Sequence, residues 1–150
     1  MVSIEPVSSH DRADWLDLWN GYLAFYETEL SDATTDETFA RLTDADSAPH
    51  GAIARDATGK PLGLVHWLTH RGTWTTSEHC YLEDLFVSTE ARGTGAGRAL
   101  VEHVRDWAED HGSAKVYWLT AETNTTARAL YDQVATRTGF IHYEIDLKQR

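Results

Sequence analysis

The chain has 150 residues, of which 41% are hydrophobic, so its composition is typical of one folded domain and not of a disordered segment. Its formal net charge of −11 disfavours nucleic acid and anionic membranes as partners, because both attract basic surfaces. The one cysteine, Cys80, excludes a disulfide within the chain. Residues 1–10 lack the features of a signal peptide, and no apolar run reaches the roughly 20 residues of a membrane span. We therefore expect a cytoplasmic protein.

The spacing of apolar residues predicts helices that alternate with strands. The first helix is expected to run from Ser8 or Ser9, either of which can cap it, to about residue 28. A second helix should begin between residues 31 and 36, and a helix over 95–110 carries an apolar stripe. In chain order, the other expected elements are strands over 2–6, 50–55, 61–71, 81–87 and 115–120, a helix over 124–136, and a strand over 139–147.

Three glycines at alternate positions, Gly93, Gly95 and Gly97, lie where the third expected helix begins. A glycine-rich turn at a helix N-terminus exposes backbone N–H groups at the positive end of the helix dipole, and such groups bind phosphate. The spacing differs from a P-loop, which needs a Lys followed by Ser or Thr after its glycines. It also differs from a dinucleotide-binding turn, since five residues separate Val87 from the first glycine. A nucleotide-binding protein of either kind is therefore disfavoured.

Two carboxylates, Glu83 and Asp84, interrupt a strand that is otherwise made of Tyr, Leu, Phe and Val. Burying a carboxylate is costly unless it is paired or used chemically. The structural alternative is an acid that caps a bulge or pairs with Arg or His. Neighbouring residues of a regular strand face opposite sides of the sheet, so at most one of the two should point into a given cleft.

The pattern Arg92-x-x-Gly95-x-Gly97, placed between a strand and a helix, resembles the acyl-CoA pyrophosphate loop of the GNAT superfamily of N-acetyltransferases. The expected element order is similar to the order in that superfamily over about residues 2–147. The resemblance implies an α/β (α+β) fold in a single domain over residues 1–150. It further implies a mixed, mostly antiparallel, twisted sheet that is flanked by helices and splayed where the cofactor, acetyl-CoA, enters.

A second segment, Asn124-x-x-Ala127-x-x-x-Tyr131, is similar to another signature of this superfamily. By that resemblance Asn124 contacts the CoA arm, and Tyr131 protonates the leaving thiolate as general acid. The alternatives are a helix N-cap for Asn124 and a core aromatic for Tyr131. The residues that the resemblance assigns to the cofactor are Leu85, Phe86, Val87, Arg92, Gly93, Thr94, Gly95, Ala96, Gly97, Arg98, Ala99, Asn124, Ala127 and Tyr131.

One departure from the family pattern follows Tyr131. Seven residues separate it from the pair Gly139-Phe140, where the family usually has three or four. This spacing predicts a helix that continues for about one further turn.

Acetylation of an amine needs a base, because a primary alkyl amine has a pKa near 10.4 and roughly one molecule in a thousand is neutral at pH 7. A carboxylate that takes the proton contributes about 10²- to 10⁴-fold to the rate. The segment from Glu83 to Val87 resembles the same strand of spermidine/spermine acetyltransferases, which makes Glu83 the first candidate for the base and Asp84 the second. The resemblance also implies a bulge near Val87 that frees a backbone N–H for the thioester carbonyl.

These observations favour an acetyl-CoA-dependent N-acetyltransferase. Direct attack in a ternary complex is expected, because Cys80 is not placed as a nucleophile. The acceptor is left open between a polyamine or diamine, an amino acid, and a protein or peptide amine, and the acidic composition favours a small cationic amine. No metal site is predicted, since the histidines lack metal-ligand spacing. Five aromatic residues could line an acceptor cleft or belong to the core: Trp19, Tyr22, Tyr26, Trp67 and Trp74.

Two further points stay open at the level of sequence. A non-catalytic acyl-CoA-binding sensor or regulatory module would keep the glycine-rich loop but would need neither Tyr131 nor Glu83. A homodimer is possible, although the sequence alone does not fix the oligomeric state.

Overall fold

The structure is a computed structural model that describes residues 1–148. Contacts divide the chain into two compact units, Met1–Leu119 and Thr120–Arg150. The first unit contains the whole sheet and three α-helices, and the second contains one α-helix. The single-domain organisation expected over residues 1–150 stays a prediction. None of the described helices is both long and apolar enough to span a membrane.

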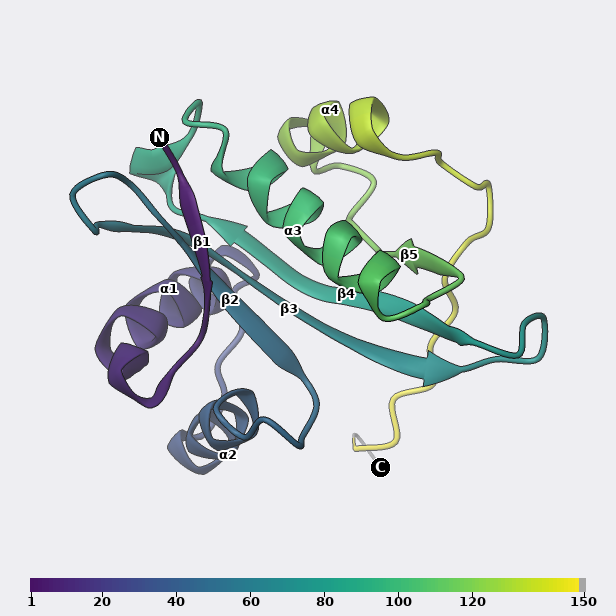
Figure 1. Ribbon diagram of the computed structural model, residues 1–150, viewed down its shortest axis with the longest axis horizontal. Coiled ribbons are helices and arrows are strands. Elements are labelled where there is room, and N and C mark those ends of the chain that lie inside the picture. The colour runs from purple at the N-terminus through teal and green to yellow at the C-terminus, as the bar shows by residue number, and fades with distance from the viewer. Residues whose placement is uncertain (149–150) are drawn as a thin grey trace. The chain divides into compact units, whose positions relative to one another are not determined.

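The sheet of the first unit has five strands in the order β1-β2-β3-β4-β5. Strands β1 to β4 are antiparallel to their neighbours, and β5 is parallel to β4. This arrangement confirms the expected mixed, mostly antiparallel sheet (Figure 1). The strands are β1 (Ser3–Pro6), β2 (His50–Arg55), β3 (Pro61–Arg71), β4 (Glu78–Val87) and β5 (Lys115–Tyr117).

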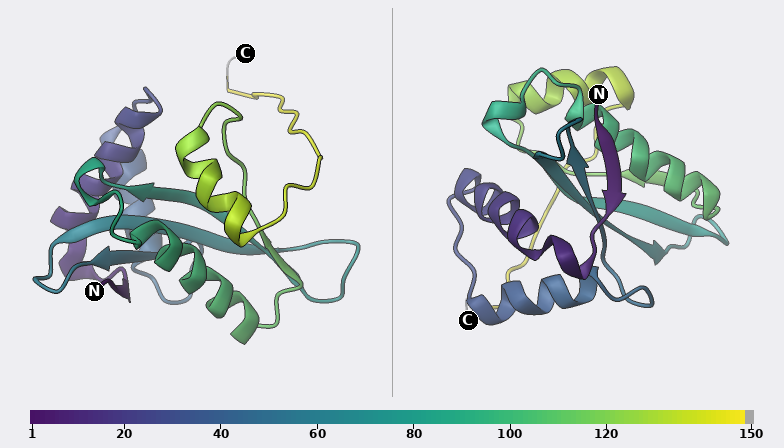
Figure 2. Two further views of the ribbon diagram at one scale, coloured as in Figure 1. Left: turned by 90° about the horizontal axis from the view of Figure 1, so that it is seen from above. Right: turned by 60° about the vertical axis from the view of Figure 1, so that its left-hand side comes forward.

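Helices cover both faces of this sheet. Helices α1 (Arg12–Phe25) and α2 (Asp32–Leu42) lie on one face, and α3 (Ala96–Asp110) lies on the other (Figure 2). Ser8 caps the 3₁₀ turn Ser9–Asp11 that leads into α1, through a reciprocal capping box with Asp11. The side chain of Ser31 accepts a hydrogen bond from the Thr34 N–H and caps α2, which begins within the predicted range.

The alternation of side chains along β3 explains how one strand serves two cores. Leu64 is fully buried and packs in the cluster beneath α1 and α2, together with Trp15. Trp67 lies on the opposite face of β3 and packs against Trp107 of α3, with ring centroids 5.7 Å apart. The remaining members of the cluster beneath α1 and α2 are Val7, Leu18, Trp19, Phe39, Leu42 and Ile53. Side chains on both faces of β3 are therefore buried, as its nearly continuous apolar sequence predicts.

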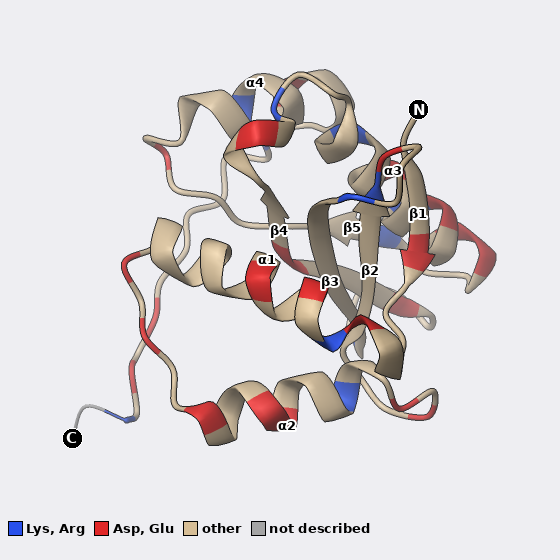
Figure 3. Ribbon diagram, turned by 90° about the vertical axis from the view of Figure 1, so that its left-hand side faces the viewer, with Lys and Arg blue, Asp and Glu red and all other residues tan. Residues whose placement is uncertain are grey.

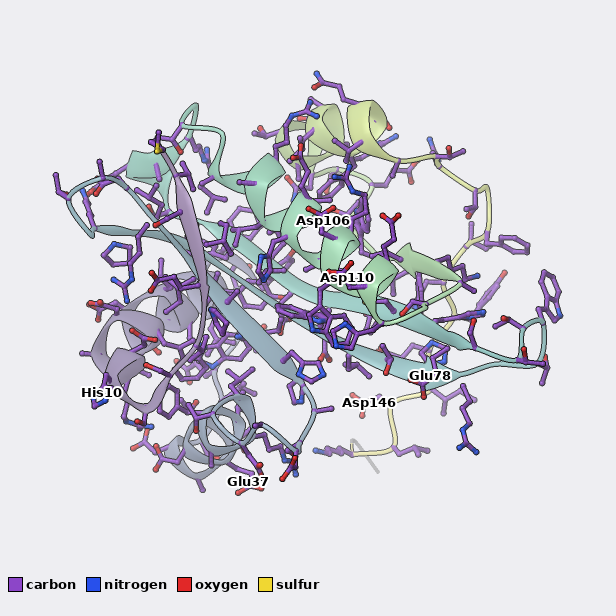
Figure 4. The ribbon with its side chains drawn as sticks, in the orientation of Figure 1. His10, Glu37, Glu78, Asp106, Asp110 and Asp146 are labelled. Carbon is purple, nitrogen blue, oxygen red and sulfur yellow. The ribbon has the colours of Figure 1, made fainter. Side chains whose placement is uncertain are left out.

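An ion-pair network fixes the start of α1 to the sheet. The Arg55 guanidinium at the end of β2 donates to Asp11 at 2.9 Å and to Asp14 at 2.8 Å. Much of the remaining charge is acidic and lies on helix surfaces, including α1 and α2 (Figure 3). Asp106 and Asp110 extend from the exposed side of α3 (Figure 4).

The ladder between β4 and β5 is short. It pairs His79, Cys80 and Tyr81 with residues 115–117, and β5 ends there although β4 continues to Val87. The two strands thus separate after Tyr81, and this separation confirms the splayed sheet that was expected. β5 ends at Tyr117, so it is shorter than the strand that the sequence predicts over 115–120.

A bulge interrupts the ladder between β3 and β4 at Glu83. His66 pairs with Asp84 and the next residue, Trp67, pairs with Leu82, so Glu83 is the extra residue. The sequence placed a bulge near Val87, but the β3–β4 register is regular there, with Val87 opposite Gly63. The bulge therefore lies four residues before the predicted position.

The second unit differs from the sequence prediction after its helix. Helix α4 (Thr125–Val134) ends close to the expected position, so the longer spacing before Gly139 does not add a helical turn. No strand forms over residues 139–147, which Figure 1 draws as an irregular trace. The predicted strand is wrong because a half-buried strand needs a sheet edge, and no described strand pairs with this segment.

Imidazole rings pack among tryptophans on the α3 side of the sheet. His50 lies 4.8 Å from the Trp107 ring and His103 lies 5.6 Å from the Trp67 ring, both measured between centroids. Burial lowers the pKa of both histidines below the ordinary value of 6.5, and the nearby His111 lowers that of His50 further. The neutral imidazoles are therefore the forms that the fold favours.

Because the folded pKa values of His50 and His103 are lowered, the unfolded chain binds protons first as the pH falls below about 6.5. We expect the free energy of unfolding to decrease from pH 7.5 towards pH 5.5, measured by urea denaturation. Replacing both residues by Gln should make this decrease smaller. His10→Gln, at an exposed position, serves as the control and should retain the full decrease. An equal decrease in the double variant would contradict the assignment.

Candidate active site

The glycine-rich loop joins β4 to α3 in the first unit. A 3₁₀ turn over Thr89–Ala91 precedes it, and the Thr94 hydroxyl donates to the Ala91 carbonyl at 2.6 Å. Gly93 and Gly95 have φ angles of 82° and 86°, in the left-handed region that residues with a Cβ rarely adopt. The sequence thus contains glycine at the two positions where the turn into the helix requires it.

Gly95 is the N-cap of α3 and has no side chain with which to cap it, while the Thr94 hydroxyl accepts from the Ala96 N–H at 3.4 Å. The first hydrogen bond of the helix runs from the Ala99 N–H to the Gly95 carbonyl, at 3.0 Å. The N–H groups of residues 96–98 precede that bond and lie at the positive end of a 15-residue helix. This end of α3 fits the pyrophosphate of a cofactor. Arg92 is exposed beside it, and Arg98 lies 3.9 Å from Glu102 of the next helical turn.

The backbone of β4 beyond the end of β5 is the second component of the site. The Ser88 N–H donates to the Leu62 carbonyl of β3 at 2.9 Å. Since N–H groups alternate in direction along a strand, those of Leu85 and Val87 point away from β3, towards the side where β5 has ended. A donor at Val87 therefore does not need a bulge at Val87.

The carboxylates Glu83 and Asp84 lie at the bulge, where the regular alternation of side chains fails. The expectation that they face opposite sides assumed a regular strand, and this premise does not hold at the bulge. Both charges act on Tyr22 of α1, and His66 acts on Glu83. Asp84 therefore lies on the α1 side of the sheet, in contact with Tyr22, and Glu83 is the carboxylate next to it in the chain.

Asp84 is held by two hydrogen-bond donors. The Tyr22 hydroxyl donates to Oδ1 at 2.7 Å, and His66 Nδ1 lies 2.9 Å from Oδ2. Trp15 Nε1 donates to His66 Nε2 at 3.1 Å. Because tryptophan can only donate, His66 Nε2 accepts and the proton of the neutral ring lies on Nδ1, which donates to Asp84. Four side chains thus form one chain of hydrogen bonds from the core beneath α1 to the carboxylate.

The surroundings distinguish the two carboxylates. The Asp84 side chain is 14% exposed and His66 is 1% exposed, whereas Glu83 reaches solvent. Burial by the surrounding protein raises the pKa of Glu83, and the negative charge of Asp84 raises it further. Burial, followed by the charge of Asp84, raises the pKa of the Tyr22 hydroxyl well above its usual value, so this hydroxyl stays a donor. Glu83 is thus the member of the pair whose side chain is exposed to solvent.

The aromatic residues of α1 line the same side of the sheet. Tyr22 stacks on Trp19, with centroids 5.2 Å apart, and meets Phe86 of β4 edge-on at 6.3 Å. Of the five aromatics considered for an acceptor cleft, Tyr22 and Tyr26 lie within the electrostatic reach of Asp84. Trp19 and Trp67 are buried in the core, and Trp74 is 88% exposed.

Asn124, Ala127 and Tyr131 all belong to the second unit. The Asn124 side chain caps α4 by accepting from the Ala127 N–H at 3.4 Å, so the structural role that the sequence allowed is present. Tyr131 lies with Ala127 on the half-buried stripe of α4. Their roles towards a cofactor stay predictions.

Cys80 lies on β4, three residues before Glu83, and its side chain is fully buried. Burial raises the pKa of its thiol to about 11. A protonated, buried thiol is a poor nucleophile.

Sequence reasoning allowed a carboxylate that pairs with His, but it did not identify the partners of Asp84. Trp15 looked like an ordinary member of an apolar helical stripe, Tyr22 like a core or cleft aromatic, and His66 like one histidine among eight. The signal that was available is a histidine within a strand that is otherwise apolar, because such a residue is buried and needs partners on both ring nitrogens.

Comparison with known proteins identifies the family. The model of the acetyltransferase (GNAT) family matches residues 15–135. The D-amino-acid N-acetyltransferase HPA3 of Saccharomyces cerevisiae is 35% identical over 144 residues, which are 95% of this chain and 89% of that protein. A thialysine N-epsilon-acetyltransferase of Caenorhabditis elegans is 28% identical over 134 residues, which are 89% of this chain and 80% of that protein.

The fold agrees with a solved structure of the enzyme AAC(6')-Iy in complex with a bisubstrate analogue, CoA-S-monomethyl-acetylneamine. The TM-score is 0.84 at 17% identity, over 97% of this chain and 98% of that one. Because the family model covers most of the sequence, the chain belongs to the acetyltransferase (GNAT) family of enzymes.

Proposed function

We propose that the protein transfers the acetyl group of acetyl-CoA to the primary amine of a small cationic acceptor, by direct attack of the amine in a ternary complex. The observation that carries this proposal is the carboxylate pair at the β4 bulge, in the same unit as the glycine-rich N-terminus of α3. Acetyl-CoA supplies a thioester whose acetyl group is transferred. All other steps are assigned to side chains and backbone groups of this chain.

The glycine-rich loop is proposed to bind the pyrophosphate, through the N–H groups at the start of α3 and the charge of Arg92 or Arg98. The Val87 N–H is proposed to donate to the carbonyl oxygen as negative charge develops on it, which is where a fixed donor lowers the barrier most. Asn124 and Ala127 are proposed to contact the arm of the cofactor. These roles rest on the family pattern and on the local geometry described above.

Glu83 is proposed as the base that takes the proton of the acceptor ammonium, directly or through water. Its raised pKa brings it closer to the pKa of a base that works near neutral pH. Asp84 is proposed as a fixed negative charge that attracts the ammonium group and raises the proton affinity of Glu83. Tyr131 is proposed to return a proton to the leaving sulfur. The buried, protonated Cys80 supports a route without an acyl-enzyme.

Two sources support different acceptors. The names of the two sequence relatives point to amines of amino acids, whereas the likeness of the Glu83 strand to spermidine/spermine acetyltransferases points to polyamines. We propose the feature that these acceptors share, a primary amine on a small molecule that carries positive charge. A panel of D- and L-amino acids, thialysine, diamines, polyamines and a peptide, assayed by release of free thiol, identifies the acceptor. A cytoplasmic location and a homodimer are also proposals.

Gly95→Glu is expected to abolish acetyl-CoA binding, because it places a side chain at φ 86° and a negative charge where the pyrophosphate would lie. Isothermal titration calorimetry measures the affinity, which we expect to be micromolar for the natural protein. Gly59→Glu is the matched control, since Gly59 has nearly the same φ of 87° in a hairpin turn outside the site. Binding of ATP or NAD in preference to CoA would overturn the cofactor assignment.

Tyr131→Phe removes one hydroxyl and keeps the ring. We expect the maximal rate to fall at least about tenfold with little change in acetyl-CoA affinity, because the proton donor is lost while binding is retained. Tyr143→Phe removes a hydroxyl elsewhere in the same unit and should leave the rate unchanged. If the Tyr131 variant keeps the natural rate while chemistry limits turnover, Tyr131 is a structural aromatic. Acetyl-CoA binding without transfer to any amine would favour the non-catalytic sensor.

Glu83→Gln is expected to lower kcat strongly, with partial recovery at higher pH, where more of the amine is already neutral. Asp84→Asn should lower kcat less. It removes the charge that raises the pKa of Glu83, so the acidic limb of the pH–rate profile should move to lower pH. It also leaves one of two buried donors without an acceptor, at a cost of about 1–3 kcal/mol in stability. If Asp84→Asn is the more damaging variant at every pH, Asp84 is the base.

A further inference from the structure

His66 is a buried polar residue of β3, and the bulge in β4 decides which carboxylate it meets. Trp67 lies opposite Leu82, so a regular ladder would place His66 opposite Glu83. The extra residue at the bulge shifts the register, and His66 lies opposite Asp84 instead. One inserted residue therefore gives this buried partner to Asp84 and not to Glu83.

Both oxygens of the Asp84 carboxylate accept hydrogen bonds from side chains of the first unit. The Tyr22 hydroxyl donates to Oδ1 at 2.7 Å, and His66 Nδ1 donates to Oδ2 at 2.9 Å. Hydrogen bonds of this kind favour the charged form of a carboxylate, because charged oxygens are stronger acceptors than those of the neutral acid. The two donors therefore act on the balance of protons between Asp84 and the neighbouring Glu83.

Trp15 controls the other nitrogen of the His66 ring. Its Nε1–H donates to His66 Nε2 at 3.1 Å, and both side chains are fully buried. Nε2 takes a second proton only if this bond is broken, which would leave the buried indole N–H without its acceptor. A positive charge on the ring would lower the pKa of Glu83, since His66 acts on that carboxylate. The Trp15 bond thus opposes a positive charge beside the two carboxylates.

The other groups that face His66 leave the two carboxylates as the sites of proton exchange. From β2, Gly51 lies opposite His66 and has no side chain. From α1, the hydroxyls of Tyr22 and Tyr26 have pKa values that burial, followed by the charge of Asp84, raises above the ordinary value. Both hydroxyls therefore keep their protons near neutral pH.

We propose that His66 is a positioning residue of the proposed reaction, which holds Asp84 as the charged partner and so directs the proton of the acceptor ammonium to Glu83. The proton passes from the amine nitrogen to a carboxylate oxygen of Glu83, and the amine keeps the electron pair that attacks the thioester. His66 acts through Asp84 and does not touch the acceptor. Although this role rests on the proposed function, the carboxylate that takes the first proton can be measured without any substrate.

Two substitutions separate the two hydrogen bonds of His66. In His66→Asn, the side-chain amide lies near the position of Nδ1, so it can still donate to Asp84 but no longer accepts from Trp15. In His66→Gln, the amide reaches the position of Nε2, so it can still accept from Trp15 but no longer donates to Asp84. Each variant loses one buried hydrogen bond, and we expect urea denaturation to show similar losses of stability. The two variants are therefore matched controls for each other.

The first test follows the side-chain carboxyl groups by carbon-13 NMR as the pH is lowered, without substrate. In the natural chain and in His66→Asn, Glu83 should take the first proton. In His66→Gln, Asp84 has lost a donor that favours its charge, so the carboxylate pair should take its first proton at higher pH and Asp84 should share it. A natural chain in which Asp84 takes the first proton would overturn the proposal, as would identical titrations of the two variants.

The second test measures kcat against pH with the best acceptor. In His66→Gln, kcat at pH 7 should fall about tenfold, which is the effect of one hydrogen bond to a charged group. Its acidic limb should move to higher pH, opposite to the shift expected for Asp84→Asn. His66→Asn should lose much less activity and keep the natural profile.

The outcomes of the second test separate this role from the reaction itself. An active natural chain whose two His66 variants have equal kcat and equal profiles would make His66 a structural residue only. A natural chain that acetylates no amine would instead overturn the proposed function. The order of proton uptake, measured by NMR, would then still decide whether His66 sets the charge of the carboxylate pair.

Discussion

The early end of the ladder between β4 and β5 is the constraint from which the site follows. The two strands pair at three positions only, so the final six residues of β4 have a neighbour on one side and an open edge on the other. Backbone groups that a complete sheet would have paired, at Leu85 and Val87, point to this opening. The loop that leaves the same end of β4 turns directly into α3. One interruption in a sheet thus brings a strand edge and a helix N-terminus to the same region.

The bulge at Glu83 adds the acids to this arrangement. A regular strand would place one carboxylate among the apolar side chains that face α3, where a charge is costly. The extra residue at Glu83 breaks this alternation, and Asp84 lies on the α1 side with His66 and Tyr22. Two donors satisfy the carboxylate oxygens of Asp84, which is mostly buried. Burial by the surrounding protein, followed by the charge of Asp84, then raises the pKa of the neighbouring Glu83, although its side chain still reaches solvent.

The local pattern of apolar and turn residues was sufficient to predict much of the fold. The bounds of β2 and β3 agree with the sequence prediction, because the turn at residues 56–59 and Pro61 limit them and their apolar runs are uninterrupted. The position of α3 was predicted equally well, because Gly95 ends the loop and an apolar stripe follows it. Glu83, Asp84 and the glycine-rich loop lie on β4 and at the start of α3, as the sequence suggested, but the bulge and the hydrogen-bond chain did not emerge from it. Trp15 and His66 are 51 residues apart, and Tyr22 and Asp84 are 62 apart, so no local period relates them. The predicted strand over 139–147 is wrong for a different reason. Its alternating pattern is typical of a strand that pairs with a sheet edge, but the pattern does not identify that edge.

The chain of hydrogen bonds from Trp15 to Asp84 also constrains how this sequence can change over time. His66 holds one tautomer because a donor lies at one nitrogen and an acceptor at the other. Losing Trp15 would leave a buried nitrogen without its donor, and losing Asp84 would leave a buried N–H without its acceptor. Substitution at any one position is therefore tolerated best when another position changes with it. Among relatives these residues should be inherited or replaced as a set, which makes His66 a marker for the carboxylate arrangement even where the surrounding sequence has diverged.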